Sequence, residues 1–307
     1  MRILVTGGAG FIGSNVVDAY IEKGYEVVVV DDLSSGKKEN LNKKAKFYTL
    51  DICDMALEGV FKEERIDIVN HHAAQVDVRK SIADPAFDAR INIEGSLNIL
   101  ENCRKYRIKK IIFASSGGVI YGECGSLPPN EDSPVSMISP YGVSKYAVEC
   151  YLSTYAKIHG LKYTALRYGN VYGPRQDPYG EAGVVAIFSG KMLDNEQVNI
   201  FGDGEQVRDY VYVEDVVKVN ILCLESGDNE IFNIGAGKST SVNQLFSEMK
   251  EMTNYFKEAV YKPPRAGELM RSSLDVRKAE QSLGWKAEVN IREGLKKTIE
   301  FFKTREI

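Results

Sequence analysis

The sequence predicts an α/β protein built on a Rossmann-type, doubly wound parallel sheet with a smaller C-terminal lobe. A β-branched apolar run at residues 2–5 leads into glycines at positions 7, 10 and 13, and residues 11–23 then place apolar side chains at helical spacing. A second apolar run, residues 27–30, ends in Asp31 and Asp32. Strand-like runs and amphipathic, helix-length segments alternate after it, as in parallel strands joined by helical crossovers.

The order of strand, glycine turn and helix around Gly7, Gly10 and Gly13 indicates a dinucleotide-binding site. Glycines permit a tight turn, let backbone N–H groups approach a pyrophosphate and let the helix pack closely on the strand. The amino end of the helix then faces the phosphate charges with its unpaired N–H groups and its dipole.

Asp31 lies 18 residues beyond Gly13, where a carboxylate accepts hydrogen bonds from ribose hydroxyls. Its charge would repel the extra 2′-phosphate of NADP, so the sequence favours NAD as the cofactor. Lys37 and Lys38 follow closely and are the residues that would favour NADP instead.

Further strands are expected at residues 46–50, 67–71, 110–115 and 162–167, and helices at residues 88–107 and 140–159. Gly7, Asp31, Asp51, Ala73 and Ser116 fall just beyond predicted strand ends, the edge at which parallel sheets bind ligands. Small and acidic residues are also common in strand-to-helix turns. Each of these residues taken alone is therefore as consistent with an ordinary turn as with ligand binding.

The alternation of strands and helices ends near Tyr168, and glycine- and proline-rich segments follow at residues 173–180 and 202–204. We therefore expect a Rossmann domain at residues 1–168 and a smaller lobe at residues 169–307. A helix near residues 213–225 is placed to return to the first domain.

The composition is that of an ordinary globular protein, with 307 residues, 44% hydrophobic and 27% charged. A net charge of −4 disfavours a nucleic-acid-binding surface. The longest apolar run, residues 184–188, is too short to span a bilayer. Residue 1 leads directly into the first strand, so we expect no targeting segment and a cytoplasmic location.

The cysteine and histidine pattern predicts no metal site. The five cysteines, at positions 53, 103, 124, 150 and 223, form no C-x-x-C pair and are expected to be reduced packing residues. His71 and His72 are adjacent at a strand end and would point to opposite faces, without acidic or thiol partners at ligand spacing.

Tyr141 and Lys145 share one face of a predicted helix. A lysine ammonium beside the phenol would lower the tyrosine pKa and make it an acid or base near neutral pH. With 17 tyrosines in the chain, a solvent-facing Tyr–Lys pair is the common alternative. The glycine turn, and Ser115 and Ser116 after a central strand, favour the catalytic interpretation.

Seven segments in order along the chain resemble the extended short-chain dehydrogenase/reductases. They are residues 6–13, 115–122, the Tyr141-x-x-x-Lys145 motif, and residues 166–173, 208–211, 264–268 and 283–285. Within that family the chain most resembles the UDP-glucose 4-epimerases, over nearly its whole length.

The resemblance implies site residues of three kinds, with the lobe at residues 169–307 binding a nucleotide sugar. The implied catalytic residues are Ser116, Tyr141 and Lys145. The implied NAD-binding residues are Gly7, Gly10, Phe11, Ile12, Gly13, Asp31, Asp32, Asp51, Ile52, Ala73, Ala74, Asn92, Ser115, Tyr141, Lys145 and Tyr168. The implied substrate-binding residues are Ser116, Asn170, Val184, Arg208, Tyr210, Arg265, Glu268 and Ser272. Glu268 stands where the family more often has aspartate.

The reaction that the resemblance implies is epimerisation at C4 of a UDP-hexose through a transient 4-keto sugar, with tightly bound NAD, in a homodimer of galactose metabolism. Nucleotide-sugar 4,6-dehydratases and decarboxylases share the fold, but the sequences of these relatives carry an acidic residue after the central strand. This chain has Ser116-Gly117-Gly118 there, which disfavours both reactions. A non-catalytic NAD-sensing protein would have no use for the three catalytic residues together.

Ser272 lies seven residues beyond Arg265. In the family that this chain resembles, the matching position borders the sugar 2-substituent, and a small residue there accompanies tolerance of N-acetyl groups. A serine that caps a turn or strand beside Ser273 is an equally good interpretation.

Overall fold

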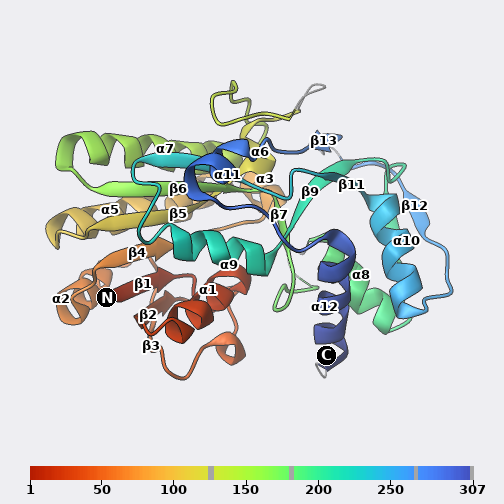
Figure 1. The fold of residues 1–307 in the computed structure, drawn as a ribbon, viewed down its shortest axis with the longest axis horizontal. Coiled ribbons are helices and arrows are strands. Elements are labelled where there is room, and N and C mark those ends of the chain that lie inside the picture. The colour runs from red at the N-terminus through yellow and green to blue at the C-terminus, as the bar shows by residue number, and fades with distance from the viewer. Residues whose placement is uncertain (124–127, 180–182, 266–268, 305–307) are drawn as a thin grey trace.

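A computed structural model of the chain describes residues 1–123, 128–179, 183–265 and 269–304. Its centre is a seven-stranded, all-parallel sheet in the order β10-β6-β5-β4-β1-β2-β3 (Figure 1). The strands are β1 (Arg2–Thr6), β2 (Glu26–Asp31), β3 (Lys46–Thr49), β4 (Ile68–His71), β5 (Lys110–Ser116), β6 (Lys162–Tyr168) and β10 (Glu230–Ile234). This order reverses direction at β1 and β4, so the doubly wound Rossmann-type prediction is confirmed.

The seventh strand, β10, was not expected from the sequence. Its first residue, Glu230, follows the last residue of β6, Tyr168, by 62 positions. The two strands pair in parallel, so that Phe232 lies opposite Leu166. The C-terminal half of the chain therefore contributes to the central sheet. The division of the chain at residue 168 stays a prediction.

Helices cover both faces of the sheet because consecutive residues of a strand point to opposite sides. Ile3 and Val5 of β1 pack with α1 (Phe11–Glu22) and α9 (Val213–Leu222), whereas Leu4 packs with the helices of the other face. These are α2 (Leu57–Glu64), α5 (Gly95–Lys105) and α7 (Pro140–His159). Two apolar cores thus sandwich the sheet.

The segment expected as one helix at residues 88–107 is divided. It comprises α4 (Pro85–Ala89), the π-helical turn η2 (Arg90–Glu94) and α5, and it follows the short α3 (Val78–Ala83). Asp84 caps α4 by accepting the backbone N–H of Phe87 at 2.9 Å. The π-helical turn contains Asn92, and such turns occur often at functional sites.

The smaller lobe has its own core and its own sheets. The strands β7 (Asn170–Tyr172), β9 (Val207–Tyr212), β11 (Ser239–Ser241) and β13 (Arg271–Ser272) form one sheet, and β8 (Asn199–Phe201) pairs with β12 (Val260–Lys262). The covering helices are α8 (Val184–Leu193), α10 (Val242–Thr253) and α12 (Ile291–Thr304). The remaining helices are η1 (Lys38–Asn40), α6 (Gly117–Ile120) and α11 (Arg277–Leu283).

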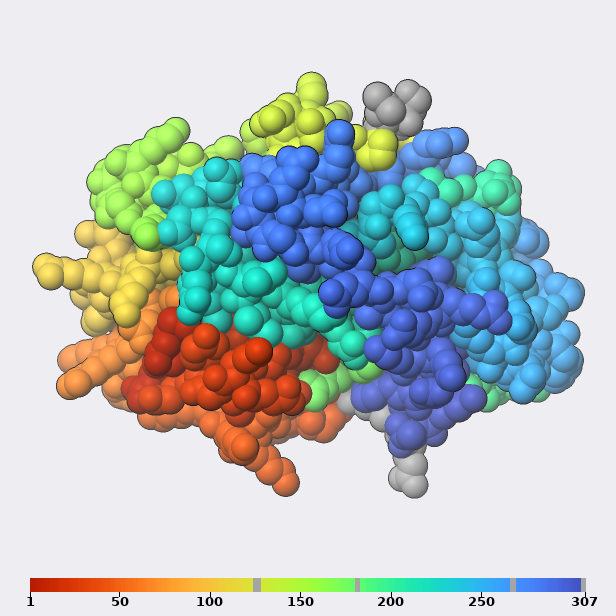
Figure 2. All heavy atoms as spheres, viewed as in Figure 1, coloured from red at the N-terminus to blue at the C-terminus, as the bar shows by residue number. Residues whose placement is uncertain are grey.

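The N-terminal and C-terminal halves of the chain are in extensive contact (Figure 2). Tyr20 of α1, for example, donates its hydroxyl hydrogen bond to the backbone carbonyl of Asn220 in α9 at 3.1 Å. None of the helices within the described ranges is long and apolar enough to cross a membrane.

Candidate active site

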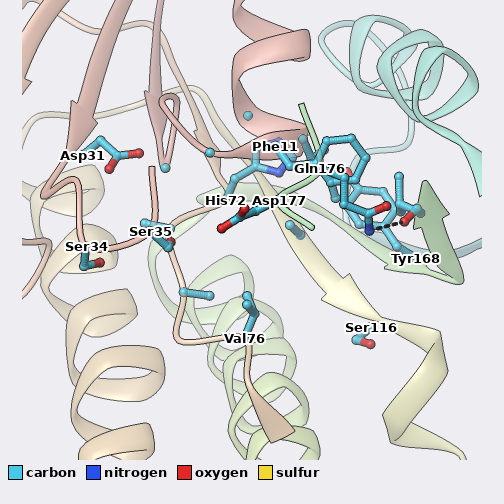
Figure 3. Close-up of a pocket in the computed structure, with 18 of the residues that line it drawn as sticks. Phe11, Asp31, Ser34, Ser35, His72, Val76, Ser116, Tyr168, Gln176 and Asp177 are labelled. Carbon is cyan, nitrogen blue, oxygen red and sulfur yellow. Dashed lines mark hydrogen bonds between the residues drawn. The ribbon is translucent and has the colours of Figure 1, made fainter. Parts of the chain in front are cut away.

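A cavity of about 460 Å³ opens at the carboxyl ends of the central strands, where the two halves of the chain meet (Figure 3). Seventeen of the predicted residues line it, namely Gly7, Gly10, Phe11, Ile12, Gly13, Asp31, Asp32, Asp51, Ile52, Ala73, Ala74, Ser115, Ser116, Tyr141, Lys145, Tyr168 and Asn170. Residues far apart in the sequence therefore share one space.

The glycine turn at one end of the cavity leaves no room for side chains. Gly7 has a φ of +69°, and a Cβ at this position would lie 2.6 Å from the backbone nitrogen of Ala73. A Cβ at Gly13 would lie 2.2 Å from the carbonyl oxygen of Gly7. Any larger residue would therefore displace the backbone between β1 and α1.

Asp31, at the end of β2, is fixed by the backbone. Its carboxylate accepts the N–H groups of Ala9 at 2.9 Å and Leu33 at 2.8 Å. Burial raises its pKa, and the two N–H donors oppose that change. Lys37, the residue that would favour NADP, forms an ion pair with Asp177 at 3.5 Å from the other side of the cavity.

Three buried polar atoms of cavity-lining residues have no hydrogen-bond partner within the described part of the chain. They are His72 Nε2, Arg175 Nη1 and Gln176 Oε1. Buried polar atoms in proteins normally have hydrogen-bond partners. These three atoms are therefore suited to hydrogen bonds with a polar ligand in the cavity. With the glycine turn and Asp31 they fit a dinucleotide such as NAD.

Sequence reasoning missed His72, Arg175 and Gln176 as site residues. Arg175 is held by an ion pair with Asp18 of α1 at 2.6 Å, so the segment after β7 is anchored to the first half of the chain. The break in the βα pattern at residues 173–180 marked this segment, but nothing in the sequence placed it against the glycine turn.

The predicted catalytic residues lie together at the other end of the cavity. Ser116 ends β5, opposite Tyr168 in β6. Tyr141 and Lys145 lie in the first turns of α7, and Ser139, the N-cap residue just before the helix, accepts the N–H of Gly142 with its hydroxyl at 3.2 Å. Proline at the first helical position fits this start, because its missing N–H needs no partner there.

Lys145 points toward the end of β5. Its Nζ donates to the carbonyl oxygen of Ala114 at 2.9 Å and lies 4.7 Å from the ring centre of Phe113 and 5.8 Å from that of Tyr141. Burial lowers the pKa of Lys145 to about 8, while the carboxylates of Asp88 and Glu149 act in the opposite direction. Lys145 therefore loses its charge more easily than an exposed lysine.

The expectation of a lowered Tyr141 pKa is wrong for this arrangement, in which the pKa is raised. Burial raises the pKa of Tyr141, and the carboxylate of Asp88 raises it further. The sequence shows the one-turn spacing of Tyr141 and Lys145 but not the loss of water around the phenol, which is the larger effect here.

Four predicted cofactor-binding residues form hydrogen bonds with other residues of the protein. Ser115 donates its hydroxyl hydrogen bond to Glu149 at 2.5 Å, and Tyr168 accepts from the amide of Asn220 at 2.8 Å. Asp51 accepts the N–H of Cys53 at 2.8 Å. Asn92 does not line the cavity; its amide exchanges hydrogen bonds of 2.9 Å with the backbone N–H and C=O of Gln75.

The small sheet brings several predicted substrate residues together. Asn170 pairs with Tyr210, and Ser272 pairs with Arg208, in strands adjacent to β9. A Cβ at Gly118 would lie 3.8 Å from both Asn170 Oδ1 and Ser116 Oγ and 4.0 Å from Ser272 Oγ. These three side-chain oxygens therefore converge beside α6.

The remaining predicted substrate residues lie farther from the cavity. Val184 begins α8, directly after the cavity-lining Gly183. Arg265 is exposed, and its guanidinium carbon lies 4.0 Å from the ring centre of Phe201. Glu268 lies outside the described residues, as does Cys124. Within the described ranges, no three histidine, cysteine, aspartate or glutamate side chains gather as a metal site.

Comparison with known proteins agrees with this geometry. Residues 3–235 match the NAD dependent epimerase/dehydratase family. A UDP-glucose 4-epimerase from Thermotoga maritima, solved with UDP-glucose, is 59% identical, covers 99% of both chains and has a TM-score of 0.97. The corresponding enzyme of Thermus thermophilus, solved with NAD, is 44% identical over 99% of both chains with a TM-score of 0.95.

A UDP-N-acetylglucosamine 4-epimerase from Methanobrevibacter ruminantium, in complex with UDP-N-acetylmuramic acid, is 38% identical. It covers 99% of this chain and 98% of its own, with a TM-score of 0.93. With its parallel sheet, glycine turn and matching length, the chain belongs to the NAD dependent epimerase/dehydratase family.

Proposed function

We propose that the protein inverts the configuration at C4 of a UDP-hexose, using NAD that stays bound through the cycle. One observation carries this proposal: Ser116, Tyr141 and Lys145 line one end of a cavity whose other end is the glycine turn with Asp31. A dinucleotide bound along the cavity would present its reactive end to the three side chains. The UDP-glucose 4-epimerases with more than 40% identity to this chain support the choice of reaction and substrate.

In the proposed reaction Tyr141 moves the proton of the C4 hydroxyl. When bound, NAD supplies the hydride acceptor and later the hydride donor at C4. Tyr141 as phenolate accepts the hydroxyl proton, the C4–H bond breaks with its electron pair, and a 4-keto sugar results. Ser116 hydrogen-bonds the same oxygen throughout. After the sugar turns about its diphosphate linkage, C4 would take the hydride back on its other face and Tyr141 would return the proton, so no net oxidation occurs.

Lys145 is the cation that this chain places beside Tyr141. Burial raises the Tyr141 pKa, so the phenolate depends on positive charge near the ring. Lys145 supplies such a charge 5.8 Å from the ring centre and also holds the nicotinamide ribose in this proposal.

The sugar nucleotide is proposed to lie against the small lobe. Asn170, Tyr210 and Val184 hold the sugar and uracil side, Arg208 and Arg265 pair with the diphosphate, and Glu268 accepts a ribose hydroxyl. Guanidinium groups suit this role because they offer two aligned donors to phosphate oxygens. Ser272 leaves space for a 2-acetamido group, so UDP-N-acetylglucosamine is proposed as a second substrate.

The competing reactions are not favoured. A dehydratase or decarboxylase needs an added acidic group at the start of α6, and the residues there are Ser116, Gly117 and Gly118. A sensor of NAD would not require a tyrosine, lysine and serine at one end of the cofactor cavity.

We also propose a homodimer formed through α5 and α7, acting in the cytoplasm. Val143, Tyr151 and Ile158 are exposed apolar residues at helical spacing along α7, which supports packing against a second copy. The free thiols of Cys53, Cys103, Cys150 and Cys223 suit a reducing compartment. Sedimentation equilibrium of the wild type and of Ile158→Glu tests the dimer.

The experiment that tests the function combines product analysis with one substitution. The purified protein is incubated with UDP-galactose, and the products are examined by mass spectrometry and chromatography. Epimerisation gives a product of unchanged mass and altered sugar, dehydration gives loss of water, and no change indicates a sensor.

Tyr141→Phe should retain bound NAD and lose about 10²–10⁴-fold in turnover, the usual contribution of a proton-transfer group. Tyr261→Phe, in the exposed part of β12, is the matched control and should keep its turnover. Near-normal epimerisation by Tyr141→Phe would contradict the assignment.

A further inference from the structure

Asp88 is a fully buried carboxylate in α4, outside the set of residues assigned above. Its Oδ1 accepts hydrogen bonds from Gln75 Nε2 at 2.9 Å and Asn92 Nδ2 at 3.0 Å, and its Oδ2 accepts from Ser144 Oγ at 2.7 Å. Ser144 is the residue next to Lys145 on α7. Asp88 therefore joins the segment after β4, the π-helical turn η2 and the catalytic helix.

Among the described residues, no lysine or arginine forms an ion pair with Asp88. The basic side chains on the adjoining elements are used elsewhere. Arg79 pairs with Asp77, and Lys80 and Arg90 lie 4.3 Å and 5.6 Å from the ring centre of Phe87. An unpaired buried carboxylate is costly, and here three neutral donors offset part of that cost.

Four titratable side chains besides Tyr141 surround Lys145. Glu149 lies one turn along α7 but is neutralised by Arg167, whose Nη2 is 2.6 Å from its carboxylate. His71, at the end of β4, and the following His72 have pKa values lowered by burial and by Lys145, so both rings are neutral and neither adds charge. Asp88 is thus the carboxylate near Lys145 whose charge no cation cancels.

We propose that Asp88 is a positioning residue for the reaction, whose buried carboxylate keeps the ammonium of Lys145 charged beside Tyr141. This inference rests on the proposed roles of Tyr141 and Lys145. Burial disfavours the cation, and the carboxylate opposes that effect across the Ser144 contact. The same negative charge disfavours the Tyr141 phenolate, so Asp88 moves both ionisations toward higher pH.

The test compares kcat/KM against pH for the wild type and Asp88→Asn, which keeps the shape and removes the charge. Asp88→Asn should lower the pKa of Lys145 by about one unit, an effect at the low end for a nearby opposite charge. The alkaline limb should then move by the same amount, and the ratio of activity at pH 8 to activity at pH 6 should fall about fivefold. The lost charge also lowers the Tyr141 pKa, but this raises the phenolate fraction by the same factor at pH 6 and pH 8 and leaves that ratio unchanged.

Ser144→Ala is the matched control, because it removes one donor to Asp88 without changing any charge. It should leave the position of the alkaline limb unchanged, whereas a merely structural role for Asp88 would make the two variants lose activity alike with no displacement. A double variant, Asp88→Ser with Ser144→Asp, returns a carboxylate to the same contact and should restore the alkaline limb. An Asp88→Asn profile with an unmoved alkaline limb overturns the proposal.

A second readout needs no turnover. Lysines labelled with ¹³C at Cε are titrated by NMR in the NAD-containing protein, and the Lys145 signal is identified by its loss in Lys145→Met. The Lys145 pKa should fall in Asp88→Asn and not in Ser144→Ala. A wild-type value below 7 would overturn the proposal even if Asp88→Asn did not fold, because Lys145 would then not be kept charged at neutral pH. Because this titration is independent of catalysis, it distinguishes failure of the Asp88 proposal from failure of the proposed function, which Tyr141→Phe tests.

Discussion

Glu149 and Arg167 form a buried ion pair between α7 and β6, with 2.6 Å between Glu149 Oε2 and Arg167 Nη2. The arginine Nε adds contacts of 3.0 and 3.2 Å to the two carboxylate oxygens. Glu149 also accepts from Ser115, and Arg167 donates to the hydroxyl of Tyr121 at 2.6 Å. The pair therefore joins α7, β5 and β6 directly behind Ser116 and Lys145.

Glu149→Gln should destabilise the protein by about 3–5 kcal/mol, because the guanidinium of Arg167 would remain buried without its countercharge. Urea unfolding at a fixed NAD concentration measures the change in the free energy of unfolding. Glu293→Gln, in the exposed i,i+4 pair with Lys297, is the control and should cost less than about 1 kcal/mol. Equal losses in the two variants would contradict a special role for the buried pair.

The sequence predicted the parts of the fold that depend on local pattern. The apolar runs and the glycine turn located β1, α1 and β2, because a short continuous apolar run and a 3.6-residue apolar period both report burial directly. The strand β10 was missed because its place beside β6 depends on contacts across more than 60 residues, which no local period reveals. The lining role of Arg175 and Gln176 was missed for the same reason.

The chemical environment was harder to predict than the positions. Tyr141 and Lys145 were found from their spacing, but the effect of burial on the phenol and the presence of Asp88 behind α7 depend on packing. Asn92 was expected at the cofactor, whereas its amide is engaged with Gln75 and Asp88. Spacing along one helix does not report which side chains other elements place against it.

His72 should make the protein sensitive to acid. Burial lowers its pKa from 6.5 to about 3, so the folded protein keeps the ring neutral while the unfolded chain takes up a proton below pH 6.5. The unfolded state then binds more protons, and stability is lost as the pH falls from 6.5 toward 3. Between pH 7 and pH 5 this single group should cost about 2 kcal/mol.

Replacing the His72 imidazole by an apolar ring should remove this dependence of stability on pH. Urea unfolding at pH 7 and at pH 5, with NAD held constant, measures the free energy of unfolding at each pH. Its decrease between pH 7 and pH 5 should be about 2 kcal/mol smaller for His72→Phe than for the wild type. His159→Gln, at the exposed end of α7, serves as the control for loss of a histidine. If His72→Phe and the wild type lose the same stability on acidification, the buried neutral imidazole is not responsible.

Ser272 lies where a larger side chain would fill the space beside Ser116. It is buried, pairs in register with Arg208, and its Oγ approaches the same point beside Gly118 as Ser116 Oγ and Asn170 Oδ1. A hydroxymethyl group leaves volume for a 2-acetamido substituent and offers a hydrogen bond. A phenol ring would occupy that volume, and forcing the substituent against it should cost about 1–3 kcal/mol or more.

We therefore expect the wild type to epimerise both UDP-glucose and UDP-N-acetylglucosamine, and Ser272→Tyr to lose about 5- to 150-fold in kcat/KM on the N-acetyl substrate while sparing the other. Parallel rate measurements on the two sugars check this. Arg271→Tyr is the matched control, because Arg271 is the exposed neighbour of Ser272 in β13 and adjacent strand residues point to opposite faces, and it should not change the ratio of the two rates. A wild type inactive on UDP-N-acetylglucosamine, or a Ser272→Tyr variant that loses both activities equally, would show that Ser272 does not control access of the 2-substituent.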